Sequence, residues 1–211
     1  MVDVNASSGT ADAQPDLGAL YAPPSDMILK GVLDHLLDFH QDYLDVATFF
    51  CLATCSDKGL DASPRGGPAG FVKVLDSRRV AFADWPGNNR IESLHNMERD
   101  NRVGMLFLFP GLEVFLRING RAHISTDPDL LQRVSENKRL PKTAIVVDID
   151  EVLFHCGKAA NRAGLWDAAA RIDRNTLPSI GKMYVAMAAV KDAQPEAVDA
   201  HYDDAVKNNL Y

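Results

Sequence analysis

The clearest pattern in the chain is a series of β-branched and aromatic segments in which apolar residues recur at every second position. The longest segment places Val114, Leu116 and Ile118 on one face and Phe115 and Arg117 on the other, as in a strand with one buried face. Similar runs, separated by turn-forming Asp, Ser, Pro and Gly residues, predict six strands. The predicted strands span residues 49–54, 70–75, 79–84, 103–109, 114–124 and 143–154.

The connections between these strands are short, which favours antiparallel pairing. Six long strands with few devices that protect a sheet edge also favour closure of the sheet on itself. The pattern therefore predicts a mainly β fold with peripheral helices, built around a six-stranded antiparallel barrel.

Apolar residues at helical spacing predict helices around this barrel. The first predicted helix has Ser25 as its N-cap and runs to about Leu44. The Thr126-Asp127-Pro128 start signal opens another helix between two strands. The remaining predicted helices, including the one opened by that signal, cover residues 90–99, 127–137, 158–171, 177–190 and 195–210.

Size and composition fit one domain with appendages. The chain has 211 residues, of which 46% are hydrophobic and 24% charged, so a core can form without disulfides. Residues 1–24 are rich in Ala, Ser, Asp, Gly and Pro and are expected to form a flexible arm. We expect the barrel domain with its N-terminal helix to span 25–170 and a helical C-terminal extension to span 171–211.

Net charge and cysteine content limit the classes of partner that the protein could bind and indicate its cellular compartment. The formal charge is -7, so the surface repels a phosphate backbone and non-specific nucleic-acid binding is disfavoured. The three cysteines show no paired or metal-binding spacing. No secretory leader is recognisable, and no apolar run approaches the roughly 18 residues of a membrane span. We expect a cytoplasmic protein with reduced thiols that binds neither a metal nor a membrane.

The segment with the most chemical information is Phe82-Ala83-Asp84-Trp85-Pro86-Gly87-Asn88-Asn89-Arg90-Ile91, where a strand ends, the chain turns and a helix begins. Such a turn offers backbone N–H groups, a helix dipole, two amides and a guanidinium in one place, which suits a phosphate group. A simpler interpretation is that Asn88 or Asn89 caps the helix and Arg90 is solvated. Trp85 is either a core residue or a neighbour of a ligand.

A second basic segment follows the last strand. On a helix, Lys158, Arg162 and Trp166 share one stripe that could meet an anionic aromatic ligand. Alternatively, Arg162 makes a cation–π contact with Trp166, and Lys158 pairs with Asp148 or Asp150.

A Gly- and Pro-rich stretch, Ser63-Pro64-Arg65-Gly66-Gly67-Pro68-Ala69-Gly70, precedes the second predicted strand. Its glycines either let the backbone approach a flat group or form an irregular connection. The sequence contains no phosphate-loop motif and no Ser-His-Asp, His-Glu-x-x-His or paired-carboxylate pattern. We therefore assign no catalytic residue.

Together and in this order, these segments resemble the pyridoxamine 5'-phosphate oxidase-like superfamily of FMN-binding split barrels. The resemblance runs from about Phe49 to Trp166 and is greatest to a flavin-nucleotide-binding subgroup. Four blocks carry it: Ser-Pro-Arg-Gly, Trp-Pro-Gly-Asn-Asn-Arg, Leu-Arg-Ile-Asn-Gly-Arg-Ala and Lys-Ala-x-x-Arg-x-x-Leu-Trp. The resemblance implies a split barrel and a homodimer that holds two FMN molecules in clefts between its subunits.

The cofactor contacts that the resemblance implies fall into three groups. The flavin ring would lie against the backbone of one strand, at Phe71, Val72 and Lys73. The phosphate would be held at the turn, by Asn88, Asn89 and Arg90, and the end of the preceding strand, at Ala83 and Asp84, would also contact the cofactor. The partner subunit would contribute Arg117, Lys158, Arg162 and Trp166.

The chain departs from the biosynthetic pyridoxamine phosphate oxidases in three places. Those enzymes begin the ring-binding strand with Arg, where this chain has Gly70. They use Ser-Arg-Lys at the phosphate turn, where this chain has Asn-Asn-Arg. They also end with an Arg-x-His signature for the substrate phosphate, and in this chain that region reads Lys-Ala-Ala-Asn-Arg. We expect the flavin site to survive, with Arg65 or Lys73 supplying the lost charge, and the vitamin substrate to be lost.

The leading functional hypothesis is an FMN-dependent oxidoreductase that acts on a small molecule, with NAD(P)H as a candidate electron donor. The flavin carries out the redox chemistry, so the protein need not supply an acid or a nucleophile. Arg65 and Arg117 either orient an anionic substrate or stabilise the reduced flavin, or they form salt bridges across the dimer interface. The alternatives are a flavin carrier or sensor without turnover and a barrel with an empty site.

Overall fold

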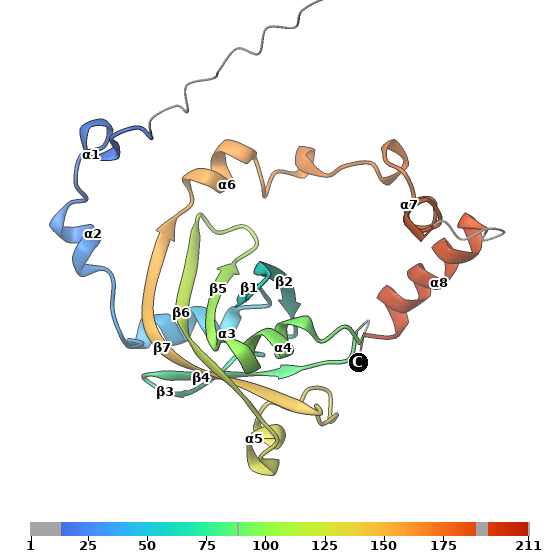
Figure 1. Ribbon diagram of the computed structural model, residues 1–211, viewed down its shortest axis with the longest axis horizontal. Coiled ribbons are helices and arrows are strands. Elements are labelled where there is room, and N and C mark those ends of the chain that lie inside the picture. The colour runs from blue at the N-terminus through green and yellow to red at the C-terminus, as the bar shows by residue number, and fades with distance from the viewer. Residues whose placement is uncertain (1–13, 88, 189–193, 211) are drawn as a thin grey trace, which may run out of the picture. The chain divides into compact units, whose positions relative to one another are not determined.

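The computed structural model describes residues 14–87, 89–188 and 194–210. Within these ranges, seven strands form one antiparallel sheet in the order β2-β1-β5-β6-β7-β4-β3 (Figure 1). The predicted mainly β fold with peripheral helices is confirmed, but the hydrogen-bonded sheet ends at β2 and β3 and does not close. The strands are β1 (Phe49–Ser56), β2 (Gly59–Gly66), β3 (Lys73–Asp76), β4 (Arg79–Asp84), β5 (Arg102–Leu108), β6 (Val114–Ser125) and β7 (Thr143–Cys156).

The prediction of six strands is wrong because it misses β2, which pairs with β1 along its whole length. Pro64 and the glycines of this segment are typical of loops, but β2 is an edge strand, where a residue without an N–H donor is tolerated. The strand expected from Gly70 begins later, at Lys73, because Gly70 has a left-handed backbone (φ +70°).

The core lies on one face of the sheet, which we call the inner face and define by the fully buried Phe50 of β1. The Phe50 ring packs against Phe71, Phe82 and Phe107, with ring centroids 5.6, 5.1 and 4.9 Å away. The alternation predicted for β6 is confirmed, since the side chains of Leu116 and others at every second position are buried. The opposite face of the sheet is called the outer face below.

The single helix predicted from Ser25 to about Leu44 is two helices, α2 (Asp26–Lys30) and α3 (Asp38–Val46). Between them Leu33 pairs with Val152 of β7 through two backbone hydrogen bonds of 3.0 and 2.7 Å. A continuous helix would lose both bonds to the sheet, and an interior glycine at position 31 is unfavourable for it as well. Tertiary pairing therefore overrides the helical pattern at this point.

The chain divides into two compact units, Met1–Gly31 and Val32–Tyr211. The described part of the first unit contains α1 (Leu17–Leu20) and α2, and neither helix has a buried residue. Asp16 caps α1 by accepting a 3.0 Å hydrogen bond from the Gly18 N–H. The flexible arm and the C-terminal extension, as bounded from the sequence, stay predictions.

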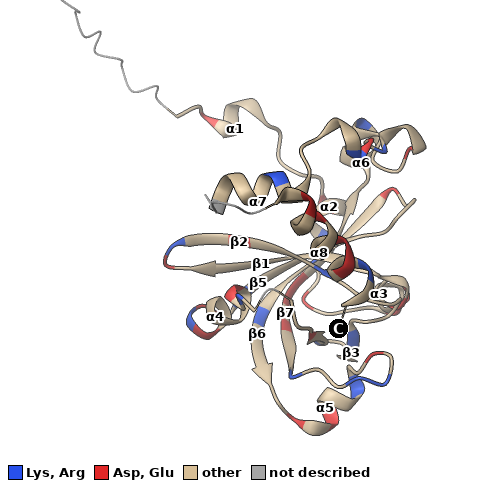
Figure 2. Ribbon diagram, turned by 90° about the vertical axis from the view of Figure 1, so that its right-hand side faces the viewer, with Lys and Arg blue, Asp and Glu red and all other residues tan. Residues whose placement is uncertain are grey.

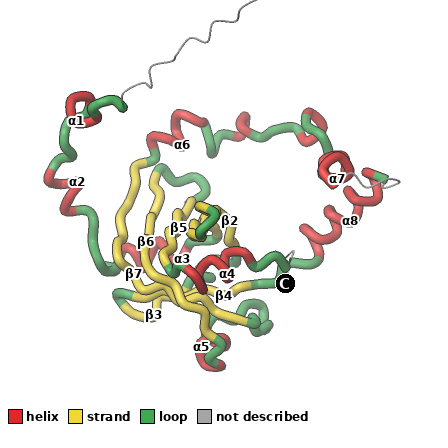
Figure 3. Tube along the Cα trace, in the orientation of Figure 1, coloured by secondary structure: helices red, strands yellow, loops and turns green. Residues whose placement is uncertain are grey.

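The other helices flank the sheet or follow it (Figure 3). They are α4 (Glu92–Arg99), α5 (Pro128–Arg133), α6 (Lys158–Ala163), α7 (Ile180–Ala188) and α8 (Pro195–Asn208), with single 3-10 turns at Ala168–Ala170 and Arg174–Thr176. The predicted start of α5 is confirmed, because the Asp127 carboxylate accepts hydrogen bonds from the Asp129 and Leu130 N–H groups. The predicted extension to residue 137 is wrong, because Asn137 and Lys138 have positive φ and form a tight turn.

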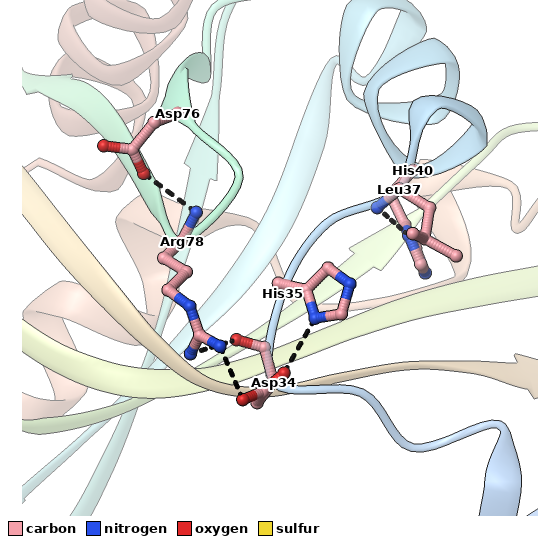
Figure 4. Close-up of polar contacts among 6 residues, drawn as sticks. All are labelled: Asp34, His35, Leu37, His40, Asp76 and Arg78. Carbon is pink, nitrogen blue, oxygen red and sulfur yellow. Dashed lines mark hydrogen bonds and ion pairs between the residues drawn. The ribbon is translucent and has the colours of Figure 1, made fainter.

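The start of α3 contains a buried histidine, His40, shown in Figure 4. Its Nδ1 accepts a 2.9 Å hydrogen bond from the Leu37 N–H, and its ring stacks on Phe154 with centroids 5.1 Å apart. Burial, together with the nearby His35, lowers the pKa of His40 below its ordinary value. Close by, hydrogen bonds from His35 and Arg78 lower the pKa of the exposed Asp34 carboxyl to about 2.

These pKa directions predict acid sensitivity. Because the pKa of His40 is lower in the folded state than in the unfolded one, its contribution to stability is complete above about pH 6.5 and is lost as pH falls through the folded value. Asp34 stays ionised over that interval. Denaturant unfolding between pH 8 and 5 should show the loss, and His40→Gln, which keeps an acceptor without titrating there, should show a smaller one. Equal pH profiles would contradict this assignment.

Candidate functional site

The turn between β4 and α4 contains two residues with left-handed backbone. Asn89 has φ +59°, and Ile91, the N-cap of α4, has φ +43°. Asparagine tolerates this conformation, but a β-branched isoleucine adopts it rarely, so the turn is locally strained. The capping role considered for Asn89 is wrong, and Asn88 lies outside the described residues. Since isoleucine has no polar side chain, the N-cap residue itself leaves the first N–H groups of α4 to other acceptors.

Arg90 lies between these two residues and is largely exposed, at 66% of its side-chain surface. Its guanidinium forms a 2.5 Å ion pair with the Glu92 carboxylate on the first turn of α4. An exposed pair of this kind contributes little to stability. Arg90 can therefore exchange Glu92 for a ligand anion at small cost.

A half-buried guanidinium, that of Arg65, lies beside the end of β4. Arg65 pairs with Phe50 across β2 and β1 and so projects on the inner face. Burial raises the pKa of the Asp84 carboxyl at the end of β4, and the positive charge of Arg65 opposes that rise. Burial likewise lowers the pKa of Arg65, against the charges of Asp84 and Asp61. The Arg65 Nε is buried and has no hydrogen-bond partner in the part of the chain that is described.

Asp61 links the Arg65–Asp84 pair to the turn that precedes α4. Its carboxylate accepts hydrogen bonds from Ser63 Oγ on the same strand, at 3.1 Å, and from Ser93 Oγ in the first turn of α4, at 3.4 Å. The structure thus brings four predicted residues together at one place, Arg65, Asp84, Asn89 and Arg90, although 19 positions separate the first two in the sequence.

Ala83 and Trp85, on either side of Asp84, face a second apolar cluster on the outer face. Its other buried members are Ala81, Val134, Ala144 and Val146. Trp85 Nε1 donates a 3.0 Å hydrogen bond to the buried carboxylate of Glu136. Of the two interpretations of Trp85, the structure favours a packing residue, and Ala83 can offer only its backbone to a ligand.

A pocket of about 350 Å³ lies beside β3, at the edge of the sheet. It is lined by Gln41, Asp45, Ala69, Gly70, Val72, Lys73, Val74 and Arg133. Lys73 Nζ donates a 2.7 Å hydrogen bond to Gly70 O, and Arg133 Nη2 donates one of 2.6 Å to Val74 O. The side chains of Phe71 and Val72 are buried, so these two residues could contact a ligand only through their backbone.

Gly70 cannot easily be replaced in this pocket. Its φ is +70°, and a Cβ at this position would lie 3.2 Å from Asp45 O. A larger residue would combine backbone strain with crowding against α3. The arginine that the biosynthetic enzymes have at this position would therefore be strained and crowded here. Of the two residues expected to supply the lost charge, Lys73 lies in the pocket and Arg65 lies on the inner face beside Asp84.

Comparison with family models matches residues 36–156, more than half of the chain, to the model described as "Pyridoxamine 5'-phosphate oxidase". The chain belongs to this pyridoxamine 5'-phosphate oxidase family. The match begins before α3 and ends with β7, so it includes both the turn and the pocket. A comparison with curated proteins found no match.

Solved structures include similar folds. HupZ of Group A Streptococcus is 16% identical, with 56% of this chain and 92% of that chain covered and a TM-score of 0.44. An FMN-binding protein of Syntrophomonas wolfei is 10% identical, with 53% and 79% covered and a TM-score of 0.41. The FAD-binding protein of Mycobacterium smegmatis is 17% identical, with 58% and 97% covered and a TM-score of 0.40.

In this member of the pyridoxamine 5'-phosphate oxidase family, Arg117 lies on the outer face, away from Arg65. It forms an ion pair with Glu151 on the neighbouring strand β7, and Asn119 Nδ2 donates to the same carboxylate at 3.3 Å. The Arg117 Nε is buried without a hydrogen-bond partner among the described residues. Within one chain, the structure does not bring Arg117 to the turn or the pocket.

The stripe predicted from Lys158 and Arg162 to Trp166 is wrong. Helix α6 ends at Ala163, where Gly164 adopts a left-handed conformation (φ +57°). Trp166 thus follows the helix, and its Nε1 donates a 2.9 Å hydrogen bond to Leu112 O. The glycine one position beyond the last helical residue is a common helix stop and could have been recognised in the sequence.

Sequence reasoning missed the contributions of Gln41, Asp45 and Arg133 to the pocket. They come from α3 and α5, which lie far from β3 in the sequence. No motif surrounds them, so no local signal could have marked them. Only the packing of three elements around the β3 edge brings these side chains together.

In residues 14–87, 89–188 and 194–210, no three His, Cys, Asp or Glu side chains are grouped closely enough to hold a metal ion. Over the same residues, no helix combines the length and the apolar character that a membrane crossing requires.

Proposed function

We propose that this protein binds FMN, with the phosphate at the Asn89–Arg90 turn and the flavin ring in the pocket beside β3, and that it is an oxidoreductase. The observation that carries the proposal is that the turn follows β4 and the pocket lies beside β3, which pairs with β4. Lys73 lies opposite Ala81 on the outer face, and Asp84 on the inner face is three residues further on, about 10 Å in the strand direction. A five-carbon ribityl chain covers a separation of this order along the strand.

The residues present fit such a cofactor. The partnerless Arg65 Nε is a buried donor that an anion can satisfy. The start of α4, which the Ile91 side chain does not cap, and the exposed Arg90 add donors and positive charge. Asp84 would repel a phosphate, and the positive charge of Arg65, which acts on Asp84, offsets this repulsion.

When bound, FMN would supply the hydride-accepting ring, and the chain would bind, orient and shield it. We assign no catalytic residue. A small molecule remains the proposed substrate and NAD(P)H the proposed donor. Strict pyridoxamine 5'-phosphate oxidation is not proposed, because the segment after β7 lacks the Arg-x-His signature.

A homodimer with FMN between subunits is part of the proposal. The outer face carries exposed apolar side chains, including Leu60 (86% exposed) and Leu106 (37%), beside the Arg117–Glu151 pair. A second subunit on this face would cover them and could bring Arg117, Lys158, Arg162 and Trp166 to its partner's flavin. The described cysteines are free, which is in keeping with the cytoplasmic location that we propose.

Spectroscopy and anaerobic reduction test this function. The purified protein, mixed with FMN if colourless, should show flavin bands near about 370 and 450 nm that stay with the protein on gel filtration. Anaerobic NADH or NADPH should then bleach the 450 nm band within seconds. A flavin that remains oxidised with every donor would favour a carrier or sensor. A protein that binds no flavin would contradict the proposal.

A further inference from the structure

The pocket beside β3 contains two cations from different elements. Lys73 begins β3, and Arg133 is the last residue of α5. Asp45 of α3 is the one carboxylate in the lining, so the lining is positive overall in a chain whose net charge is -7. Figure 2 shows that α5 itself carries charges of both signs. The positive pocket is thus a local feature rather than part of a generally basic surface.

Both cations are held against the backbone of β3 or of the residues just before it. Each donates to a carbonyl there, Lys73 to Gly70 O and Arg133 to Val74 O. An ammonium carries three N–H donors and a guanidinium five, so a single carbonyl leaves donors for a ligand. β3 is also the last strand of the sheet, with a strand neighbour on one side only.

We propose that Arg133, together with Lys73, binds the carbonyl-bearing pyrimidine edge of the flavin ring and stabilises the negative charge that the ring gains on reduction. This inference rests on the function proposed above. When bound, the flavin would supply a ring that gains one negative charge on taking a hydride, two electrons and one proton, from a reduced nicotinamide, which becomes oxidised. A cation beside that edge lowers the free energy of the charged form.

The geometry favours the ring over the phosphate as the group that Arg133 binds. The phosphate turn lies beyond Asp84, about 10 Å along β4 from the residue opposite Lys73. Arg65 and Arg90 are the cations at that end. Arg133 therefore acts as a positioning and redox-tuning residue for the ring. It lies on α5, outside the four sequence blocks that carry the resemblance.

The test compares Arg133 variants in the full chain with FMN and with riboflavin, which lacks the phosphate. Arg133→Ala and Arg133→Gln should each weaken binding of both flavins about tenfold, the effect of one charge-assisted contact. Arg133→Lys, which keeps the charge, should stay within about threefold. Arg79→Ala is the matched control, because Arg79 is an exposed arginine in the β3–β4 hairpin that pairs with Asp76 outside the pocket.

The midpoint potential of the bound flavin, measured against a reference dye, gives the second readout. If Arg133→Gln weakens binding of the reduced ring tenfold more than binding of the oxidised ring, the potential falls by about 30 mV. Arg133→Lys should restore it. Far-UV circular dichroism and thermal unfolding check that the variants are folded, and glutamine keeps a donor for Val74 O.

The outcomes separate this inference from the function on which it rests. Wild-type protein that binds neither flavin overturns both. Wild-type protein that binds flavin, with Arg133 variants of unchanged affinity and potential, overturns only the role of Arg133. A loss confined to FMN would place Arg133 at the phosphate, and a loss for both flavins without a change in potential would leave it no electrostatic role. Either result overturns the inference.

Discussion

The double variant Asn89→Gly/Arg90→Ala is expected to bind FMN about 100-fold more weakly than the wild type while unfolding at the same temperature. Each lost hydrogen bond to a phosphate is worth roughly 1 to 3 kcal/mol, and a 100-fold change corresponds to about 2.7 kcal/mol. Glycine is the better replacement at position 89 because φ is +59° there, where alanine would add strain of its own. Fluorescence titration with FMN measures the effect.

Riboflavin and a second arginine variant control this experiment. The double variant should bind riboflavin as the wild type does, because riboflavin has no phosphate. Arg99→Ala, at the other end of α4, removes an exposed arginine that lies 3.6 Å from Asp57 and should leave FMN affinity unchanged. Full FMN affinity in the double variant would mean that the phosphate binds elsewhere.

Phe50→Ala is expected to lower the free energy of unfolding by about 3 to 5 kcal/mol, the usual cost of removing a buried phenyl ring. Phe50 is fully buried and contacts three other phenylalanine rings, so the cavity has little chance to collapse. For a chain of this size the change corresponds to about 6 to 20 °C in Tm. Urea unfolding followed by tryptophan fluorescence measures it.

Phe50→Leu is the matched variant, because it keeps an apolar side chain and leaves a smaller cavity. It should lose clearly less stability than Phe50→Ala. Phe71, which stacks on Phe50 at 5.6 Å, precedes the pocket strand, so the alanine variant should also bind FMN less tightly. A loss of stability below about 1 kcal/mol would show that the core relaxes around the missing ring.

Local patterns predicted most of the strands because each depends on a signal confined to a few residues. The alternation around Leu116 specifies which face of β6 is buried, and Asp127 marks the start of α5. The turn after β4 could be recognised as a candidate phosphate site from its residue types alone. The family match then confirmed the resemblance on which the site residues were chosen, although the roles of those residues stay predictions.

Two of the errors share one physical cause, competition from partners distant in the sequence. Pro64 is compatible with a strand only because β2 is an edge strand, and the sequence does not say which strand that is. The helical pattern around Leu33 gives way to two hydrogen bonds with Val152. The stripe through Trp166 is wrong for a different reason. Gly164, directly after the last helical residue, adopts a left-handed conformation and ends α6.

By itself, the sequence determined that the protein is mainly β and antiparallel, which face of its longest alternating strand is buried, and that a polar turn rich in donors follows the strand that ends at Asp84. These properties depend on residue type and on periods of two or a few residues. Only the tertiary structure decided that Arg65 lies beside Asp84 and that Arg133 joins Lys73 in one pocket. The proximity of residues that lie far apart in the sequence depends on strand order and helix packing. These are set by the summed free energy of the whole core rather than by any local segment.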